Sequence, residues 1–356
     1  MREAATDAVE RPALDEEKAS RRLRRGLISL AILVALVVGL VLAVPGLHGI
    51  GRTVAHMPGG WVAAAIALEI LSCLAYVLAF LQVFERAPIR FGARVALSEL
   101  AFGSAVSLGG AGSVAVGAWL LIDRGGQPAR VAQRSAVLFL LTSAVNVITL
   151  TLAGLALFVG ILPGPHSPLL SALPAGVGIV LLTFFLCLPH LSERGAATRA
   201  PGRIQMLLTT TAESVRDTRD LLLKPDWRIV GAFAYLWCDI GVLAACFAAT
   251  GHTPPLTAIV LAYQIGYLAN VIPIPGGIGV LDGSMVGMLV LYGIAATPAA
   301  AATFVYHAIA LWIPAMWGTL AFLVLRRTRH KTLTPRPTLG ERRRLRAERP
   351  RPPNSV

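Results

Sequence analysis

Apolar runs of bilayer-spanning length recur along the whole sequence and limit what this chain can fold into. Six runs are long enough to cross about 30 Å of hydrocarbon as α-helices. They lie at residues 27–44, 61–83, 135–161, 168–189, 229–250 and 300–325. Only 14% of all residues are charged, against about 25% in soluble domains. The chain is therefore predicted to be an all-α polytopic membrane protein. An ordinary soluble enzyme, a disordered chain and a disulfide scaffold are excluded.

Two further apolar regions, 95–122 and 256–293, are interrupted by glycine and proline. The first contains Leu-Gly-Gly-Ala-Gly-Ser at 108–113, and the second contains Pro-Ile-Pro-Gly-Gly-Ile-Gly at 273–279. Proline removes a helical donor and glycine weakens a helix, so both regions should break there. Each arm is then too short for a comfortable span, and broken backbone at membrane depth must be covered by protein or line a cavity. We therefore expect two re-entrant hairpins.

The basic residues predict which loops face the cytoplasm. Arginine and lysine gather in three loops, 84–94, 123–134 and 190–228, whereas Arg52 is the only basic residue of the predicted outer loops. The positive-inside rule then places both termini in the cytoplasm, and the expected location is a bacterial plasma membrane. Two full spans in place of each hairpin would keep the same sides, so charge leaves that alternative open.

The order of segments predicts a single membrane domain, residues 27–325, built from two inverted halves. Residues 27–161 and 168–325 each run span, span, hairpin, span, which gives six full transmembrane helices and two re-entrant hairpins. Inverted repeats with paired broken segments are typical of transporters and place the site near the midplane. We expect residues 1–26 to be a cytoplasmic tail and 326–356 to be a basic, disordered one.

Ionisable side chains inside the apolar runs are the first candidates for function, because they are costly to insert. Asp282 ranks first, since it follows the glycine-rich break and could bind a proton, a coupling cation or an amine headgroup. A simple helix N-cap is the alternative. Glu99, in the entering arm of the first hairpin, is a second candidate for headgroup or proton binding.

Other polar residues keep two interpretations. Glu69 and Asp239 lie in the second span of each half, where they either line one cavity or make local hydrogen bonds. His307 follows Tyr306 in the last span and is either functional or a packing histidine. A helix of residues 204–222 may be taken as a surface helix or as a solvated linker.

The hairpin tips favour anions, because glycines allow close approach to backbone N–H groups at half-helix starts. Arg124 beside the first hairpin either attracts anionic headgroups or only signals topology. The predicted substrate-binding or coupling residues are Glu99, Gly109, Gly110, Gly112, Arg124, Asn270, Pro273, Pro275, Gly276, Gly277, Gly279, Asp282, Tyr306 and His307. No catalytic residue, metal site or cofactor is predicted.

The second hairpin carries a resemblance to a known family. The relevant residues are Asn270–Gly279, Asp282, Leu291–Ile294, Tyr306 and Trp312–Pro314, with Gly109–Gly112, Gly117–Trp119 and Arg124–Gly126 in the first hairpin. Over about 95–325 the chain resembles the lysylphosphatidylglycerol synthase transmembrane family. That family is the flippase-type membrane domain of bacterial aminoacyl-phospholipid synthases, and it also occurs as stand-alone proteins.

The resemblance implies a lipid translocase whose partners are membrane lipids, either an anionic or aminoacylated phospholipid or a polyprenyl-phosphate lipid. Asp282 stands where family members often carry Glu, and Ser113–Val116 replace charged residues that often follow the first glycines. No aminoacyl-transferase domain is recognised, so this chain is not expected to synthesise the lipid. A small-solute secondary transporter and a membrane-embedded enzyme using a polyprenyl-phosphate donor remain alternatives. A homo-oligomer or an envelope-synthesis partner is also open, and no nucleic-acid partner is expected.

Overall fold

The described chain is built of α-helices. A computed structural model describes residues 48–105, 111–164, 168–196, 202–223, 226–269 and 280–333, and several residues between 20 and 31. No strand occurs within these ranges. Most of the predicted first span, 27–44, lies outside the described residues, as do the residues of both glycine-rich tips at 106–110 and 270–279 and the tail after 333.

Five helices are long and apolar enough to cross a membrane. They are α3 (Gly59–Val83), α6 (Pro128–Phe158), α7 (Pro168–Ala196), α9 (Val230–Ala249) and α12 (Ala296–Leu333). Each matches one of the predicted runs, but several bounds differ, and α7 continues to Ala196, past the predicted end at 189. Helix α6 begins at Pro128, a residue suited to the first helical turn, so Arg130 and Arg134 are helical and not in a loop. Helix α12 continues to Leu333, so the start of the expected disordered tail is helical.

Each interrupted region contains two short helices that pack against each other. The first region holds α4 (Ile89–Ala105) and α5 (Ala111–Asp123), and the second holds α10 (Leu256–Ala269) and α11 (Val280–Leu291). They contain 17, 13, 14 and 12 residues. At about 1.5 Å per residue, each is shorter than the roughly 30 Å hydrocarbon core.

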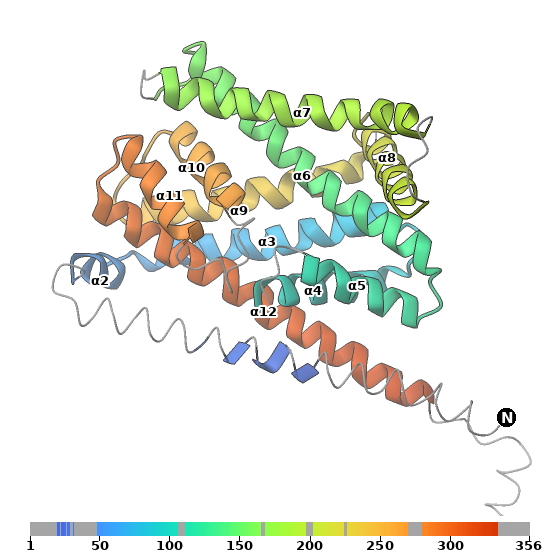
Figure 1. The fold of residues 1–356 in the computed structure, drawn as a ribbon. Helices are drawn as coiled ribbons and strands as arrows, with labels where there is room; N and C mark the ends of the chain where they lie inside the picture. The colour runs from blue at the N-terminus through green and yellow to red at the C-terminus, as the bar shows by residue number, and fades with distance from the viewer. Residues whose placement is uncertain are drawn as a thin grey trace, which may run out of the picture.

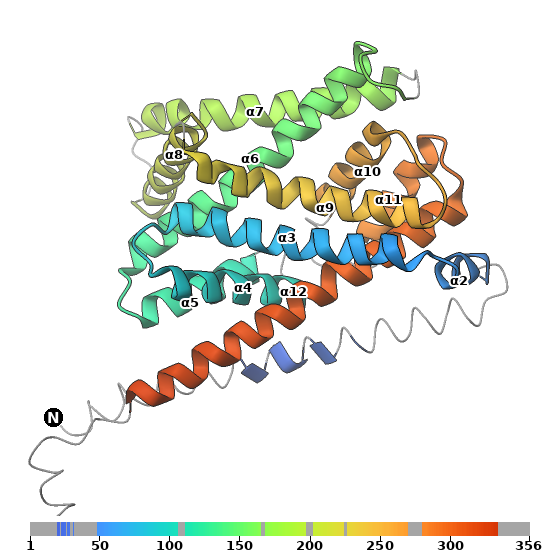
Figure 2. The ribbon, with the colours of Figure 1, turned by 180° about the vertical axis from the view of Figure 1, so that it is seen from behind.

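Helices α3 and α9 lie side by side at the centre of the bundle and form its most extensive helix pair (Figures 1 and 2). Phe80 of α3 and Leu243 of α9 are fully buried in the main hydrophobic core. The Ser72 hydroxyl donates a hydrogen bond to the backbone carbonyl of Tyr235 at 2.9 Å, which joins the two helices directly. Helices α4, α6, α10, α11 and α12 surround this pair.

Helix α7 lies at the edge of the bundle, where it packs on α6 (Figure 1). Its exposed side chains include Leu173, Val180 and Phe184, which form an apolar surface suited to lipid. Helix α8 (Gly202–Leu223) packs on α6 and α7, and Gln133 donates a hydrogen bond to Asp217 at 3.2 Å between α6 and α8. The predicted helix at 204–222 is thus confirmed as a helix. Helix α2 (His48–Ala55) contacts α12.

Gly318 sets the close approach of α12 to α4. A Cβ atom at this position would lie 2.0 Å from the Leu97 carbonyl oxygen and 2.6 Å from the Ala101 Cβ. Gly318→Ala is therefore expected to force the helices apart and to destabilise the protein by about 1–3 kcal/mol, the usual cost of overpacking. Thermal unfolding in detergent should show a lower Tm.

The matched control is Gly287→Ala on α11, where nothing lies within 4 Å of the added Cβ. Replacing a helical glycine there is expected to leave the Tm unchanged or to raise it, because alanine favours helix by about 1 kcal/mol. Equal Tm values for the two variants would contradict the close α4–α12 contact.

Candidate functional site

Four polar side chains from four helices meet inside the bundle. They are Glu69 of α3, Asp239 of α9, Tyr263 of α10 and Tyr306 of α12, here named the central polar cluster. Both tyrosine hydroxyls donate hydrogen bonds to Asp239 Oδ2, Tyr306 at 3.1 Å. The two tyrosine rings lie edge to face, with centroids 6.2 Å apart. The second hairpin region and the last helix are thus both tied to the centre of the α3–α9 pair.

A Cβ at Gly241 of α9 would lie 3.4 Å from the Leu68 side chain of α3, and Ser72 bonds the Tyr235 carbonyl, so Glu69 and Asp239 lie at the same level of the two paired helices. Glu69 is only 5% exposed, and its Oε1 faces the Cys73 thiol at 3.9 Å. The remaining oxygens, Glu69 Oε2 and Asp239 Oδ1, are buried and receive no donor. A buried polar atom without a partner lowers the stability of the fold by about 1–3 kcal/mol, so these two oxygens call for an explanation.

A second titratable pair adjoins the cluster. Asp282 in the first turn of α11 and His307 of α12 are joined by a 2.8 Å contact between Oδ1 and Nδ1. Their side chains are 25% and 12% exposed. His307 follows Tyr306 in sequence and acts electrostatically on Asp239. Asp282 therefore does more than cap a helix, because its carboxylate binds a side chain on another helix.

Glu99 is buried separately, where α3, α4 and α5 meet. It is 2% exposed, and the Tyr76 hydroxyl donates a hydrogen bond to its Oε2 at 2.9 Å. Gly117 of α5 makes room for the carboxyl group, since a Cβ there would lie 1.5 Å from Glu99 Oε1. Glycine at this position lets the two arms of the first hairpin region close over a buried acid.

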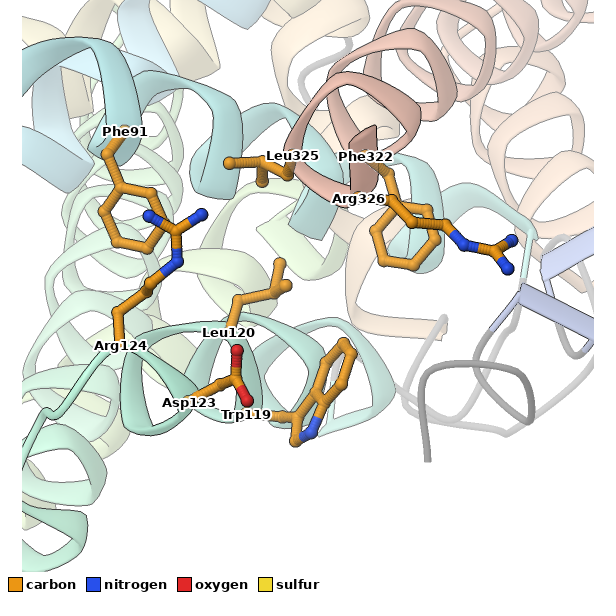
Figure 3. Close-up of a pocket in the computed structure, with 8 residues that line it drawn as sticks. All are labelled: Phe91, Trp119, Leu120, Asp123, Arg124, Phe322, Leu325 and Arg326. Carbon is orange, nitrogen blue, oxygen red and sulfur yellow. The ribbon is translucent and has the colours of Figure 1, made fainter. Parts of the chain in front are cut away.

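Arg124 lies elsewhere, in a pocket between α5 and α12 (Figure 3). Its guanidinium stacks over the Phe91 ring at 5.0 Å from the ring centroid, a cation–π geometry. Trp119 and Arg326 also line this pocket, and Arg326 donates a hydrogen bond to Ser20 Oγ at 3.3 Å. The pocket shares no lining residue with the central polar cluster.

The structure thus brings together three of the predicted residues, Asp282, Tyr306 and His307, and places Glu99 and Arg124 apart from them. Gly112 lies in the first turn of α5. Eight others, Gly109, Gly110, Asn270, Pro273, Pro275, Gly276, Gly277 and Gly279, lie outside the described residues.

Sequence reasoning missed Tyr76, and it did not select Glu69, Asp239 or Tyr263 as site residues, although Tyr263 stands among the polar groups that lead to the second tip. The available signal was the presence of one acid in the second span of each half. Within the described part of the chain, no group of three or more His, Cys, Asp or Glu side chains is placed to hold a metal ion.

Comparison with known families identifies the relatives of this bundle. Residues 26–318 match the family described as the lysylphosphatidylglycerol synthase TM region. The chain belongs to this family. The match includes the central polar cluster, the Asp282–His307 pair and Glu99. Together with the apolar helices, membership establishes a multi-pass membrane protein.

Two curated relatives, both called UPF0104 membrane protein, come from the archaeon Methanothermobacter thermautotrophicus. One is 33% identical over 97 residues, which is 26% of this chain and 28% of the relative. The other is 27% identical over 173 residues, 43% of this chain and 51% of the relative. The aligned parts thus span about half or less of these family members.

The contact between Asp282 and His307 is expected to stabilise the α11–α12 packing. In a double-mutant cycle with Asp282→Asn and His307→Gln, thermal unfolding in detergent should give a coupling energy of about 1–3 kcal/mol, typical of a partly buried hydrogen bond to a charged group. The control cycle pairs Asp282→Asn with Tyr292→Phe, whose hydroxyl donates to the Leu170 carbonyl instead. Equal coupling in both cycles would contradict a direct Asp282–His307 interaction.

Proposed function

We propose that this protein is a lipid translocase that moves an anionic or aminoacylated phospholipid between the two leaflets of a bacterial plasma membrane. The observation that carries the proposal is the central polar cluster, in which side chains of α3, α9, α10 and α12 converge inside an apolar bundle. Polar and ionisable groups at such positions are costly and mark substrate or ion pathways. A purely structural bundle has no need of them.

A lipid is favoured as substrate for two reasons. The family to which the chain belongs is named after a synthase of an aminoacylated phospholipid. In addition, the Arg124 pocket joins two guanidinium groups to aromatic side chains at one end of α5 and α12. Guanidinium groups bind phosphate well, and basic pockets between membrane helices suit anionic headgroups. We assign the headgroup phosphate to Arg124 at one stage of the passage and an ammonium group on the lipid to the Asp282 carboxylate at another, because the two residues lie in separate parts of the bundle.

We further propose six spans and two re-entrant hairpins arranged as an inverted repeat, with both termini in the cytoplasm. Support comes from matching helix contacts in the two halves, if α3, α4, α5 and α6 correspond to α9, α10, α11 and α12. Helix α4 packs on α12, and α10 packs on α6; likewise α5 contacts α6, and α11 contacts α12. Helix α3 contacts α12 as α9 contacts α6, and the two central helices pair with each other.

In this arrangement the halves would rock about the α3–α9 pair and expose the site alternately to each leaflet. The headgroup would pass Asp282 and His307 on the way, while the lipid tails stay along the apolar outer surface. Partner proteins, such as a second copy or an envelope-synthesis enzyme, are not needed for this step.

Leaflet exchange in proteoliposomes tests the proposal. Labelled phosphatidylglycerol, its lysyl form and a polyprenyl-phosphate lipid are each placed in one leaflet, and the rate of appearance in the other is measured. The wild type is expected to accelerate exchange of at least one lipid, and Asp282→Ala is expected to abolish most of it, because the headgroup loses its carboxylate contact and His307 loses its partner.

Asp220→Ala is the matched control, since Asp220 is an exposed acid on α8. It should exchange lipid at the wild-type rate. Exchange retained in Asp282→Ala would keep the function and remove the assigned site. Absence of exchange with every lipid, with or without a pH gradient, would overturn lipid translocation, and a substrate-driven ion flux would then favour a small-solute transporter.

A further inference from the structure

The carboxyl oxygens of Glu69 and Asp239 have too few hydrogen-bond donors around them. The Cys73 thiol donates to Glu69 Oε1, while the Tyr263 and Tyr306 hydroxyls donate to Asp239 Oδ2. The other oxygen of each carboxyl group is buried and receives no donor, although the two residues lie at the same level of the paired helices α3 and α9. Two carboxylates cannot hydrogen-bond to each other, because neither carries a hydrogen.

One proton on either carboxyl group removes this deficit. A protonated acid gains one O–H donor, and the other carboxylate accepts it. The pair then carries one negative charge, which the Tyr263 and Tyr306 hydroxyls stabilise on Asp239. Two ionised carboxylates at the same place would repel each other and lose their hydration inside an apolar bundle.

We propose that Glu69 and Asp239 share one proton and form the site at which this protein binds and releases a coupling proton. The inference rests on the proposed translocase function and names its energy source as a proton gradient. Glu69 is the member of the pair that most needs the proton, because its side chain is 5% exposed and its Oε2 has no donor.

The position of the pair connects protonation to movement. Glu69 lies on α3 and Asp239 on α9, one in each proposed half of the repeat. A shared proton holds the two carboxyl groups together, and its release leaves two facing negative charges, which favours separation of the halves. Binding and release of one proton therefore bias the same two-state element that alternating access requires.

A route for the proton leads away from the buried member of the pair. Asp239 is partly exposed, and His307 acts on it electrostatically. On release, the proton leaves from the side of Asp239, the partly exposed member of the pair.

Three further titratable side chains face the pair. Tyr235 and Cys238 on α9 and Tyr267 on α10 interact electrostatically with Asp239. Phenols and thiols are neutral in their ordinary protonation state near pH 7. They do not supply the missing charge balance, so the proton is shared by the two carboxyl groups themselves.

Infrared spectroscopy of the purified protein tests the shared proton independently of transport. Near neutral pH the wild type should show the carbonyl stretch of a protonated carboxylic acid. Glu69→Gln is expected to remove that band, and Asp239→Asn to shift it, because the hydrogen-bond partner changes. Asp220→Asn, the same chemical change on exposed α8, should leave it in place. A band unaffected by both Glu69→Gln and Asp239→Asn would overturn the shared proton.

Transport in proteoliposomes tests the coupling. An imposed pH gradient should accelerate net lipid movement by the wild type, with proton flux seen by a pH dye inside the vesicles. Glu69→Gln should lose both responses, and Asp220→Asn should keep them. A wild type that moves lipid without any response to the pH gradient, or that responds to a Na⁺ gradient instead, overturns the coupling proton while the translocase stands. A wild type that moves no lipid overturns the translocase, and the infrared result still decides whether the proton is shared.

Discussion

Two acidic side chains at the α3–α9 interface, buried Glu69 and partly exposed Asp239, determine how the neighbouring helices pack. No water is available in a membrane interior to hydrate Glu69 or Asp239, so each must find its partners within the protein. Asp239 finds them in Tyr263 and Tyr306, which come from α10 and α12. The second hairpin region and the last helix are thus held at the centre by the same hydrogen bonds that build the site. Packing and function therefore depend on one set of contacts.

The helices themselves were largely predictable, because bilayer thickness sets the length of an apolar run. Glycine and proline at 108–113 and 273–279 likewise indicated where two regions divide into short helices, and α4, α5, α10 and α11 follow that prediction. The errors lie at helix ends. Arg130 and Arg134 marked a loop in the charge pattern, but long arginine side chains reach polar surroundings from within a helix end, so α6 extends through them.

The site was harder to predict, because its contacts join residues far apart in sequence. Asp282, Tyr306 and His307 were selected from a local motif and an apolar run; Asp282 contacts His307, and Tyr306 bonds Asp239. The Glu69–Asp239 contact depends on how α3 and α9 are rotated about their axes. Both helices are apolar on nearly every side, so periodicity carries little information about rotation. Tyr76 was missed for the same reason, since a tyrosine in an apolar run is ordinarily a packing residue.

The two hairpin regions hold their acids in different ways. Glu99 is buried against Gly117 of α5 and accepts a hydrogen bond from Tyr76. Asp282 is partly exposed and contacts His307. A buried acid bonded only to a tyrosine has no neighbouring group that takes up a proton near neutral pH, whereas a partly exposed aspartate beside an imidazole has one. If the halves form an inverted repeat, they are therefore alike in backbone and unlike in chemistry.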